Sequence, residues 1–237
     1  MCGITGIFST SSIDSLERRI NAMNNSIIHR GPDAGDFFIE TNIALGHRRL
    51  SIIDTSESAN QPMHTNSRNW CIVFNGEIYN FKELRKELNY SFNTFSDTEV
   101  ILASVEEKGI EWFLKKANGM FALALFNTQT KKLFLIRDRL GIKPLFYYID
   151  KDKIIFASEI KAILSSGLLK AEFNESAIDE YLGNRYVRAP YTFFKNIFQL
   201  FPGSYLEINQ SMKFKKYNYW KIPEKFNAEQ DFNENKI

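Results

Sequence analysis

Apolar residues recur at helical spacing near the start of the chain. Five of them follow one another at steps of three and four: Ile13, Leu16, Ile20, Met23 and Ile27. This spacing places them on one face of a helix whose other face is polar. A second helix is predicted to begin near Ser96, because Ser96-Asp97-Thr98-Glu99 has the Ser-x-x-Glu form of a capping box and precedes an apolar run. Residues 81–88 show the pattern of a further helix.

The middle of the chain carries short apolar runs that are typical of β-strands. They cover residues 72–74, 120–126, 133–136, 145–149 and 154–157. Polar turns at 127–132 and 150–153 join neighbouring runs, and strands joined by such short turns are antiparallel. Strands with helices before, between and after them favour antiparallel sheets that pack on each other under a cover of helices, which is a layered α+β domain.

Length and composition permit a large buried core. The chain has 237 residues, of which 44% are hydrophobic, so we expect one large domain or one domain with an appendage. Thirty Lys and Arg residues stand against 28 Asp and Glu residues. No basic block is present, which disfavours a nucleic-acid partner bound through electrostatics.

The sequence indicates a soluble, cytoplasmic protein. Its start lacks the charged and apolar regions of a secretory leader, and no run approaches the roughly 18 apolar residues that a membrane span needs. Cys2 and Cys71 are the only cysteines. A reducing compartment suits a chain whose thiol must stay free to react. Cys71 lies within an apolar run and is predicted to be a small buried hydrophobe.

Cys2 is the most informative candidate for chemistry. It follows the initiator methionine, so removal of Met1 leaves a thiol and a free α-amine on one residue. The thiolate is the attacking species, and an α-amine with a pKa of roughly 7.7 to 8.0 can accept its proton without a histidine. Gly3 and Gly6 have no side chains, so a substrate can come close to the backbone there. The alternative is a cysteine that merely starts a strand. The surrounding motifs must decide between these two interpretations.

Four polar clusters follow, each beside an apolar segment. They are His29-Arg30-Gly31-Pro32-Asp33, residues 46–54, Asn75-Gly76-Glu77-Ile78-Tyr79-Asn80 and residues 96–99. Together with Cys2 they resemble the class II glutamine amidotransferases, and among them the glutaminase half of asparagine synthetase. The resemblance is strong over residues 1–163 and weaker over 190–220. Arg49-Leu50-Ser51-Ile52 and the run 156–162 favour the asparagine synthetase branch over relatives that make glucosamine phosphate.

This resemblance implies a fold and an activity. The fold is a four-layer αββα sandwich of antiparallel sheets, that of the N-terminal nucleophile hydrolases, over residues 2–220, with a linker or frayed tail at 221–237. The activity is hydrolysis of L-glutamine to glutamate and ammonia through a thioester on Cys2, for asparagine biosynthesis. Two alternatives stay open: a stand-alone glutaminase subunit that feeds sugar or peptide amidation, and a non-catalytic glutamine-sensing module.

The resemblance also assigns glutamine-binding residues. The planar guanidinium of Arg49 suits the α-carboxylate, because it can hold both oxygens in a fork, and Asp97 suits the α-ammonium. The remaining positions are the main chain of Ile52 and Ile53 and the side of Glu77. Plain structural roles stay open for the two charged residues. Arg49 would then be a surface charge on a strand, and Asp97 an acid favoured by the helix dipole.

Asn75 and Gly76 are the implied oxyanion hole. When a thiolate attacks an amide, charge moves to the carbonyl oxygen, and a side-chain amide with a backbone N–H can stabilise it. Asn-Gly is also a strong hairpin-turn signal. His29, His47 and His64 lack metal-ligand spacing, so we expect no metal site and assign them neutral packing or hydrogen-bonding roles. Residues 137–144 are predicted to form a charged turn at a domain contact.

The sequence shows no motif for binding a nucleotide. Asparagine synthetases carry a Ser-Gly-Gly-x-Asp-Ser phosphate loop, whereas Ser165-Ser166-Gly167-Leu168 lacks the second glycine and the Asp-Ser pair. We therefore expect no cofactor in this chain, and ATP and magnesium only in a synthetase domain that it lacks. The expected partner is a synthetase domain or chain that accepts ammonia. The oligomeric state, a homodimer included, stays open.

Overall fold

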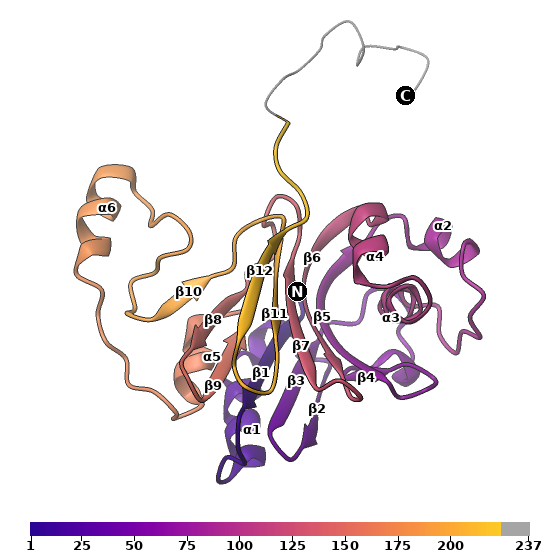
Figure 1. Cartoon of the computed structure of the whole chain (residues 1–237), viewed down its shortest axis with the longest axis horizontal. Helices are drawn as coiled ribbons and strands as arrows, with labels where there is room; N and C mark the ends of the chain where they lie inside the picture. Colours follow the sequence, from indigo (N-terminus) through magenta and orange to yellow (C-terminus); the bar gives the residue numbers. More distant parts are fainter. Residues whose placement is uncertain (224–237) are drawn as a thin grey trace, which may run out of the picture.

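The strands form two antiparallel sheets of six strands each in the computed structural model, which describes residues 1–223 (Figure 1). The first sheet has the order β10-β8-β9-β1-β3-β2. Its strands are β1 (Gly3–Ser9), β2 (Ala34–Glu40), β3 (Ile43–Arg49), β8 (Phe146–Ile149), β9 (Lys153–Ala157) and β10 (Ile197–Gln199). β1 pairs with β3 on one side and with β9 on the other, so the N-terminal strand lies in the interior of the sheet.

The second sheet has the order β12-β11-β7-β6-β5-β4. Its strands are β4 (Met63–His64), β5 (Trp70–Ile78), β6 (Gly119–Asn127), β7 (Lys132–Arg137), β11 (Ser204–Ile208) and β12 (Phe214–Asn218). The predicted antiparallel pairs are confirmed, β6 with β7 and β8 with β9. Four of the predicted runs form parts of β5, β6, β7 and β9, which extend further than the runs themselves, whereas the run 145–149 begins one residue before β8.

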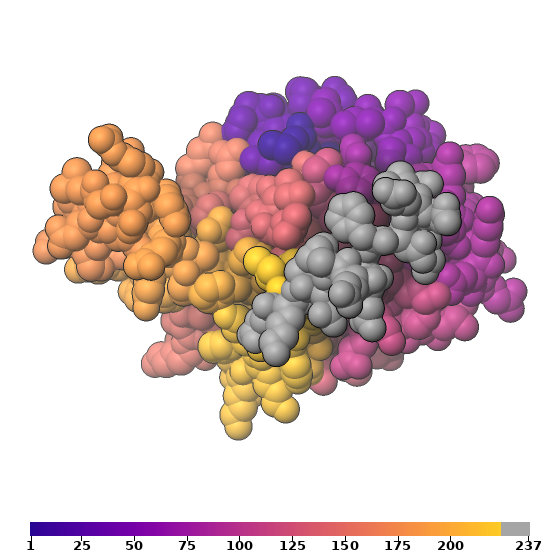
Figure 2. Space-filling model, turned by 90° about the horizontal axis from the view of Figure 1, so that it is seen from above, coloured from indigo at the N-terminus to yellow at the C-terminus, as the bar shows by residue number. Residues whose placement is uncertain are grey.

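Helices cover the outer faces of both sheets (Figure 1). α1 (Leu16–Ser26) and α5 (Ile160–Ser165) pack on the first sheet, and α3 (Asp97–Lys108) packs on the second. Around α3 lie α2 (Phe81–Lys86) and α4 (Ile110–Lys116). α6 (Ser176–Asn184) belongs to a lobe at one side of the body (Figures 1 and 2). Short 3-10 turns span Ile28–Arg30 and Glu57–Ala59. The predicted αββα sandwich is confirmed.

Three apolar clusters hold the four layers together. Ile4 and Phe8 of β1 belong to the cluster between the sheets, whereas Ile7 of the same strand belongs to the cluster under α1. This alternation follows from the two-residue period of a strand, and because both faces of β1 are covered, its whole length is buried. Phe8 packs edge-to-face on Phe126 of β6, with ring centroids 5.9 Å apart. A third cluster lies between the second sheet and its helices.

The predicted helices begin and end close to the expected places. The apolar face of α1 is buried, and Ile13 and Ile27 pack in the same cluster from just outside the helix. Ser96 is the N-cap of α3, and its hydroxyl accepts from the Glu99 N–H at 3.2 Å. The reciprocal half of the capping box is absent, because the Glu99 carboxylate accepts from the N–H groups of Asn93 and Thr94 instead.

The hairpin-turn interpretation of Asn75-Gly76 is wrong. Both residues lie inside β5, paired with Ala122 and Phe121 of β6. The tail predicted at 221–237 lies outside the described residues from position 224 onward. Among residues 1–223, no helix combines the length and apolar composition that a membrane span requires.

Phe126→Ala is expected to lower the free energy of unfolding by about 3 to 5 kcal/mol, because it empties a fully buried site between the sheets. Urea unfolding measures the loss. The control is Phe214→Ala, whose ring is 50% exposed on β12, and for which we expect a change within about 0.5 kcal/mol. Similar losses for both variants would contradict the placement of Phe126 in the core.

Candidate active site

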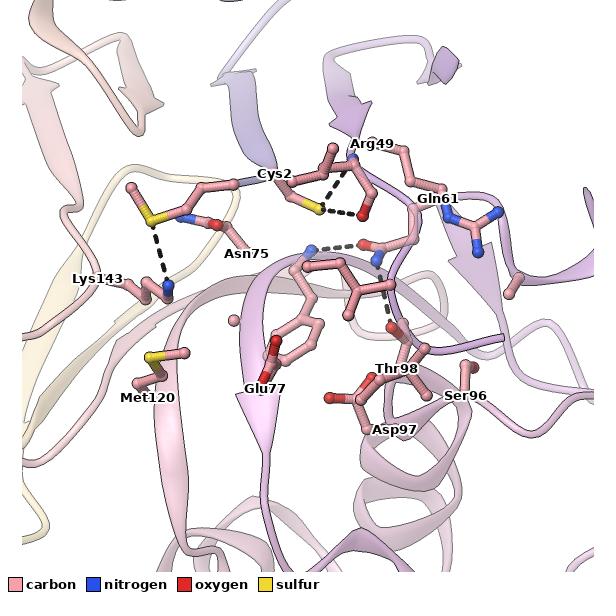
Figure 3. A pocket seen from close by; sticks show the side chains of 17 residues that line it. Cys2, Arg49, Gln61, Asn75, Glu77, Ser96, Asp97, Thr98, Met120 and Lys143 are labelled. Carbon is pink, nitrogen blue, oxygen red and sulfur yellow. Dashed lines mark hydrogen bonds between the residues drawn. The ribbon is translucent and has the colours of Figure 1, made fainter. Parts of the chain in front are cut away.

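A cavity of about 180 Å³ opens where the start of β1 and the end of β3 meet the second half of β5 and the start of α3 (Figure 3). All eight site residues predicted from the sequence line it: Cys2, Arg49, Ile52, Ile53, Asn75, Gly76, Glu77 and Asp97. They come from both sheets, from α3 and from the loop after β3. The fold therefore brings the complete predicted set to one place.

Cys2 lies at the entrance to β1, with its thiol facing the loop after β3. The Leu50 N–H donates to Sγ at 3.4 Å. Burial raises the pKa of the Cys2 thiol above its ordinary value, and the Leu50 N–H and the nearby Arg49 only partly offset this effect. At neutral pH the thiol is therefore protonated and needs a base. Cys2 and Cys71 are both free, and Cys71 is buried in β5.

The first polar cluster of the sequence holds the start of β1. Arg30 donates through Nε to the Cys2 carbonyl at 2.9 Å and through Nη1 to Glu159 at 3.0 Å. Ser158 accepts from the Ile4 N–H at 3.0 Å. These contacts explain why the motifs at 29–33 and 156–162 accompany Cys2, because they fix the backbone on which the thiol stands.

The edge of β5 that faces the cavity is not paired with a neighbouring strand. β4 pairs with β5 only at Cys71 and Ile72. In a strand, alternate residues point their main-chain groups to the same side. Further along this edge, the Phe74 N–H donates to Gln61 Oε1 at 2.6 Å, and the Ile78 N–H donates to Asp97 Oδ2 at 3.0 Å. Both of these bonds point away from β6.

Gly76 stands between these two residues, and its N–H points to the same side. Its cross-strand neighbour Phe121 forms both of its main-chain hydrogen bonds with Asp138. The Phe121 carbonyl accepts from the Asp138 N–H, and the Phe121 N–H donates to the Asp138 carboxylate. Gly76 therefore has no partner on β6, and its N–H is directed to the cavity that it lines. A Cβ at this position would lie 2.2 Å from the Met120 carbonyl oxygen, so only glycine fits here.

The side-chain amide of Asn75 is a second unused donor in the same wall. Asn75 is 1% exposed, and its Nδ2 is buried without a hydrogen-bond partner among the described residues. A buried donor without an acceptor costs roughly 1 to 3 kcal/mol. An acceptor oxygen on a ligand would relieve this cost. Asn75 Nδ2 and the Gly76 N–H thus form a pair of donors in the cavity that Cys2 also lines. Figure 3 shows Asn75 and Cys2 at the same side of this cavity.

Arg49 is buried at the end of β3, 6% exposed, so the alternative of a surface charge is wrong. Its guanidinium points away from Cys2 (Figure 3) and donates to the main-chain oxygens of Asp54 and Ser56. Arg49 therefore fixes the loop that brings Ile52 and Ile53 to the cavity. Its contact with a substrate carboxylate stays a prediction.

Asp97 has a structural contact and also faces the cavity. It is the first residue of α3, it is 5% exposed, and it accepts the Ile78 N–H. Burial, helped by the charge of Glu77, raises the pKa of its carboxyl to about 6, against the hydrogen bonds that lower it. Two carboxyl groups in one wall favour a cation, and the ammonium of an amino acid is such a group.

Gln61 and Lys143 also line the cavity, and neither was predicted as a site residue. Gln61 joins β5 to α3, since its Nε2 donates to Thr98 Oγ1 at 3.2 Å. Lys143 is 6% exposed, and its Nζ lies 3.2 Å from the Met1 sulfur. It lies in the segment 137–144 that was predicted as a charged turn. That turn is held by Asp138, whose carboxylate accepts three of the segment's own N–H groups, those of Leu140, Ile142 and Lys143.

The histidines lie apart from one another. His29 contacts Glu159, and His47 contacts the Phe74 carbonyl. Within residues 1–223, no three His, Cys, Asp or Glu side chains are grouped so as to hold a metal ion. The hydrogen-bonding role predicted for His47 is confirmed.

Comparison with known proteins identifies the family. Residues 1–220 match the family described as glutamine amidotransferase domain. The chain belongs to this family. The predicted resemblance to class II glutamine amidotransferases is confirmed. The domain is 39% identical to glutamine-hydrolysing asparagine synthetase 1 of Bacillus subtilis, over 88% of the chain and 33% of that protein. It is 41% identical to asparagine synthetase B of Escherichia coli, over 69% of the chain and 30% of that protein.

A solved structure shares the fold of the domain. The glutamine phosphoribosylpyrophosphate amidotransferase of Bacillus subtilis aligns with a TM-score of 0.68 at 20% identity, over 92% of the chain and 49% of that chain. At this identity the likeness concerns the fold alone. The domain spans about a third of the length of these two curated relatives.

Asp97→Asn is expected to raise the free energy of unfolding at about pH 7.5 by on the order of 1 to 3 kcal/mol. The folded-state pKa of Asp97 lies above its ordinary value, so the wild-type protein loses stability as the pH rises from about 4 through about 6, where the buried carboxyl ionises. Asparagine avoids this loss and can still accept the Ile78 N–H. Urea unfolding across this pH range measures the difference.

The matched control is Asp179→Asn, which changes an exposed acid in the first turn of α6. Its stability relative to the wild type is expected to stay within about 0.5 kcal/mol across the range. A difference for Asp97→Asn that did not grow with pH would contradict the buried, ionising carboxyl.

Proposed function

We propose that this domain hydrolyses L-glutamine to glutamate and ammonia through a γ-glutamyl thioester on Cys2. The observation that carries the proposal is the buried Asn75 amide, which has no acceptor within residues 1–223 and lines the same cavity as the thiol. Membership of the glutamine amidotransferase family and the full set of predicted residues support it. A purely glutamine-sensing module would have no need of two unused donors beside a nucleophile.

The chemistry begins with processing of the N-terminus. In the chain that retains Met1, the nitrogen of Cys2 belongs to a peptide bond and has no basic lone pair. Removal of Met1 turns it into an amine that takes the thiol proton. A histidine cannot replace it, because burial lowers the pKa of His47 to about 3 and His47 does not line the cavity.

Attack by Sγ on the side-chain carbonyl carbon gives a tetrahedral intermediate. Its oxyanion accepts from Asn75 Nδ2 and from the Gly76 N–H, two donors that are in place before the substrate arrives. The Cys2 ammonium then gives its proton to the leaving nitrogen, the carbon–nitrogen bond breaks, and ammonia departs. Water, deprotonated by the same amine, attacks the thioester and releases glutamate.

Substrate binding uses the other walls of the cavity. Asp97 and Glu77 receive the α-ammonium, and Arg49 receives the α-carboxylate together with main-chain groups of Ile52 and Ile53. Because the Arg49 guanidinium is bound to the oxygens of the loop after β3, a substrate carboxylate must share or replace these contacts. Glutamine binding is therefore coupled to the position of that loop.

The ammonia is used outside these residues. The relatives are named as glutamine-hydrolysing asparagine synthetases and are more than twice as long, so a synthetase part that adenylates aspartate with ATP and magnesium is the proposed acceptor. The free thiol suits the reducing conditions of the cytoplasm. A different acceptor, such as a sugar or peptide precursor, requires only a different partner and leaves the glutaminase site as it is.

Removal of Met1 is expected to switch hydrolysis on, and Cys2→Ala to abolish it without loss of fold. Intact mass and glutamate release, measured on the same sample, test both points. A variant that keeps Met1 gives the comparison, and circular dichroism checks the fold of Cys2→Ala. Full turnover by protein that retains Met1 would rule out the α-amine as the base.

Asn75→Ala and Arg49→Lys are expected to affect different kinetic constants. Asn75→Ala removes an oxyanion donor and should lower kcat on the order of 100 to 1000 fold with little change in KM. Arg49→Lys removes a contact shared by substrate and transition state, and should raise KM more than it lowers kcat. Steady-state kinetics with the processed enzyme measures both.

Arg48→Lys is the matched control, since Arg48 is the neighbouring residue of β3 and does not line the cavity. We expect both of its constants within about twofold of the wild type. Equal small losses in all three variants would show that the pocket assignment is wrong.

A further inference from the structure

Phe74 of β5 is held at both main-chain groups by side chains from other elements. Its N–H donates to Gln61 Oε1 at 2.6 Å, and its carbonyl oxygen lies 3.0 Å from His47 Nε2. His47 belongs to β3, so this second bond joins the two sheets. Figure 3 shows Gln61 placed between the main chain of β5 and Thr98 of α3. Phe74 directly precedes the two oxyanion donors.

Phe74 needs these bonds because β5 has no paired strand on this side at its position. β4 ends its pairing at Ile72, so the groups of Phe74 that point to this side would be buried without partners. Gln61 and His47 supply those partners, and Asp97 does the same for Ile78. The only position of this edge that points its N–H to the cavity is Gly76. It is thus flanked on both sides by anchored residues.

His47 is suited to act as a fixed neutral donor. It is completely buried, and burial lowers its pKa to about 3. A carbonyl oxygen only accepts, so Nε2 must carry the ring proton, and Nδ1 then carries the lone pair. Nδ1 has no partner among the described residues. The ring therefore keeps one tautomer and one charge throughout the working pH range of an enzyme.

We infer that His47 and Gln61 are positioning residues of the oxyanion hole. By holding Phe74, they keep the Asn75 amide and the Gly76 N–H directed at the site of the developing charge. Neither residue touches the reacting atoms through this contact. The inference rests on the proposed glutaminase function, and it predicts an effect on the chemical step rather than on substrate binding, because a displacement of about 1 Å can cost on the order of 100 fold in rate.

Matched substitutions separate this role from simple packing. His47→Met and His47→Gln have similar volumes, but only glutamine can donate near the position of Nε2. In the processed enzyme, His47→Met is expected to lower kcat roughly 10 to 100 fold with KM within about twofold, and His47→Gln to recover most of the loss. Gln61→Met should lower kcat in the same way, while Gln61→Glu keeps an acceptor for the Phe74 N–H and should be milder.

Alkylation of Cys2 by iodoacetamide provides the second readout, because it forms no oxyanion. Its rate is expected to stay within about twofold of the wild type in all four variants, and buried Cys71 does not contribute. His64→Gln, on β4, is the control for changing a histidine in the second sheet. Wild-type kcat in His47→Met, or a parallel fall of hydrolysis and alkylation, would overturn the inference.

Nitrogen NMR of the wild-type imidazoles tests the contact independently of activity. The inference requires His47 to be the Nε2–H tautomer without titration between about pH 5 and pH 9. A charged ring or an Nδ1–H tautomer would overturn it. Failure of the processed wild-type protein to hydrolyse glutamine would instead refute the proposed function, so the two failures are distinguishable.

Discussion

The unpaired edge of β5 is the constraint on which the rest of the site depends. Once β4 ends, every second residue of β5 presents an N–H and a carbonyl to an enclosed space, and each must find a partner. The protein satisfies Phe74 with two side chains and the Ile78 N–H with Asp97. It leaves the N–H of Gly76 to the cavity, beside the unused amide of Asn75. The proposed oxyanion hole is therefore the one position of this strand edge whose N–H is left without a side-chain partner, and the residues on both sides of it are anchored.

Cys2, the proposed nucleophile, is held in place by the pairing of β1. This strand is paired on both sides and buried on both faces, so the chain start cannot move far from the sheet. Arg30 and Ser158 hold the backbone at its entrance. The start of the chain nevertheless reaches the molecular surface (Figure 2), and Met1 is 58% exposed. A processing enzyme can thus reach Met1, whose removal would create the proposed base.

Sequence patterns predicted the layered fold and the members of the site, because both correspond to short patterns of neighbouring residues. Apolar runs between polar turns mark hairpins, and Cys2, Arg49, Asn75 and Asp97 stand in motifs with their own chemistry. Several edge strands show no such pattern of apolar residues. β12, for example, carries two lysines in five residues and is mostly exposed. No role was predicted for Gln61, and the hydrogen-bonding role predicted for His47 had no named partner, because both contacts depend on where β4 stops, which is a property of the assembled sheet.

The central claim is that processed Cys2 carries the glutamyl group during turnover, and its most direct measurement is rapid acid quenching with peptide mass spectrometry. The account predicts a transient increase of one glutamyl group on the N-terminal peptide that begins with Cys2, and no such species on protein that retains Met1. Turnover of glutamine with no adduct on that peptide, or with the adduct on another residue, would contradict it.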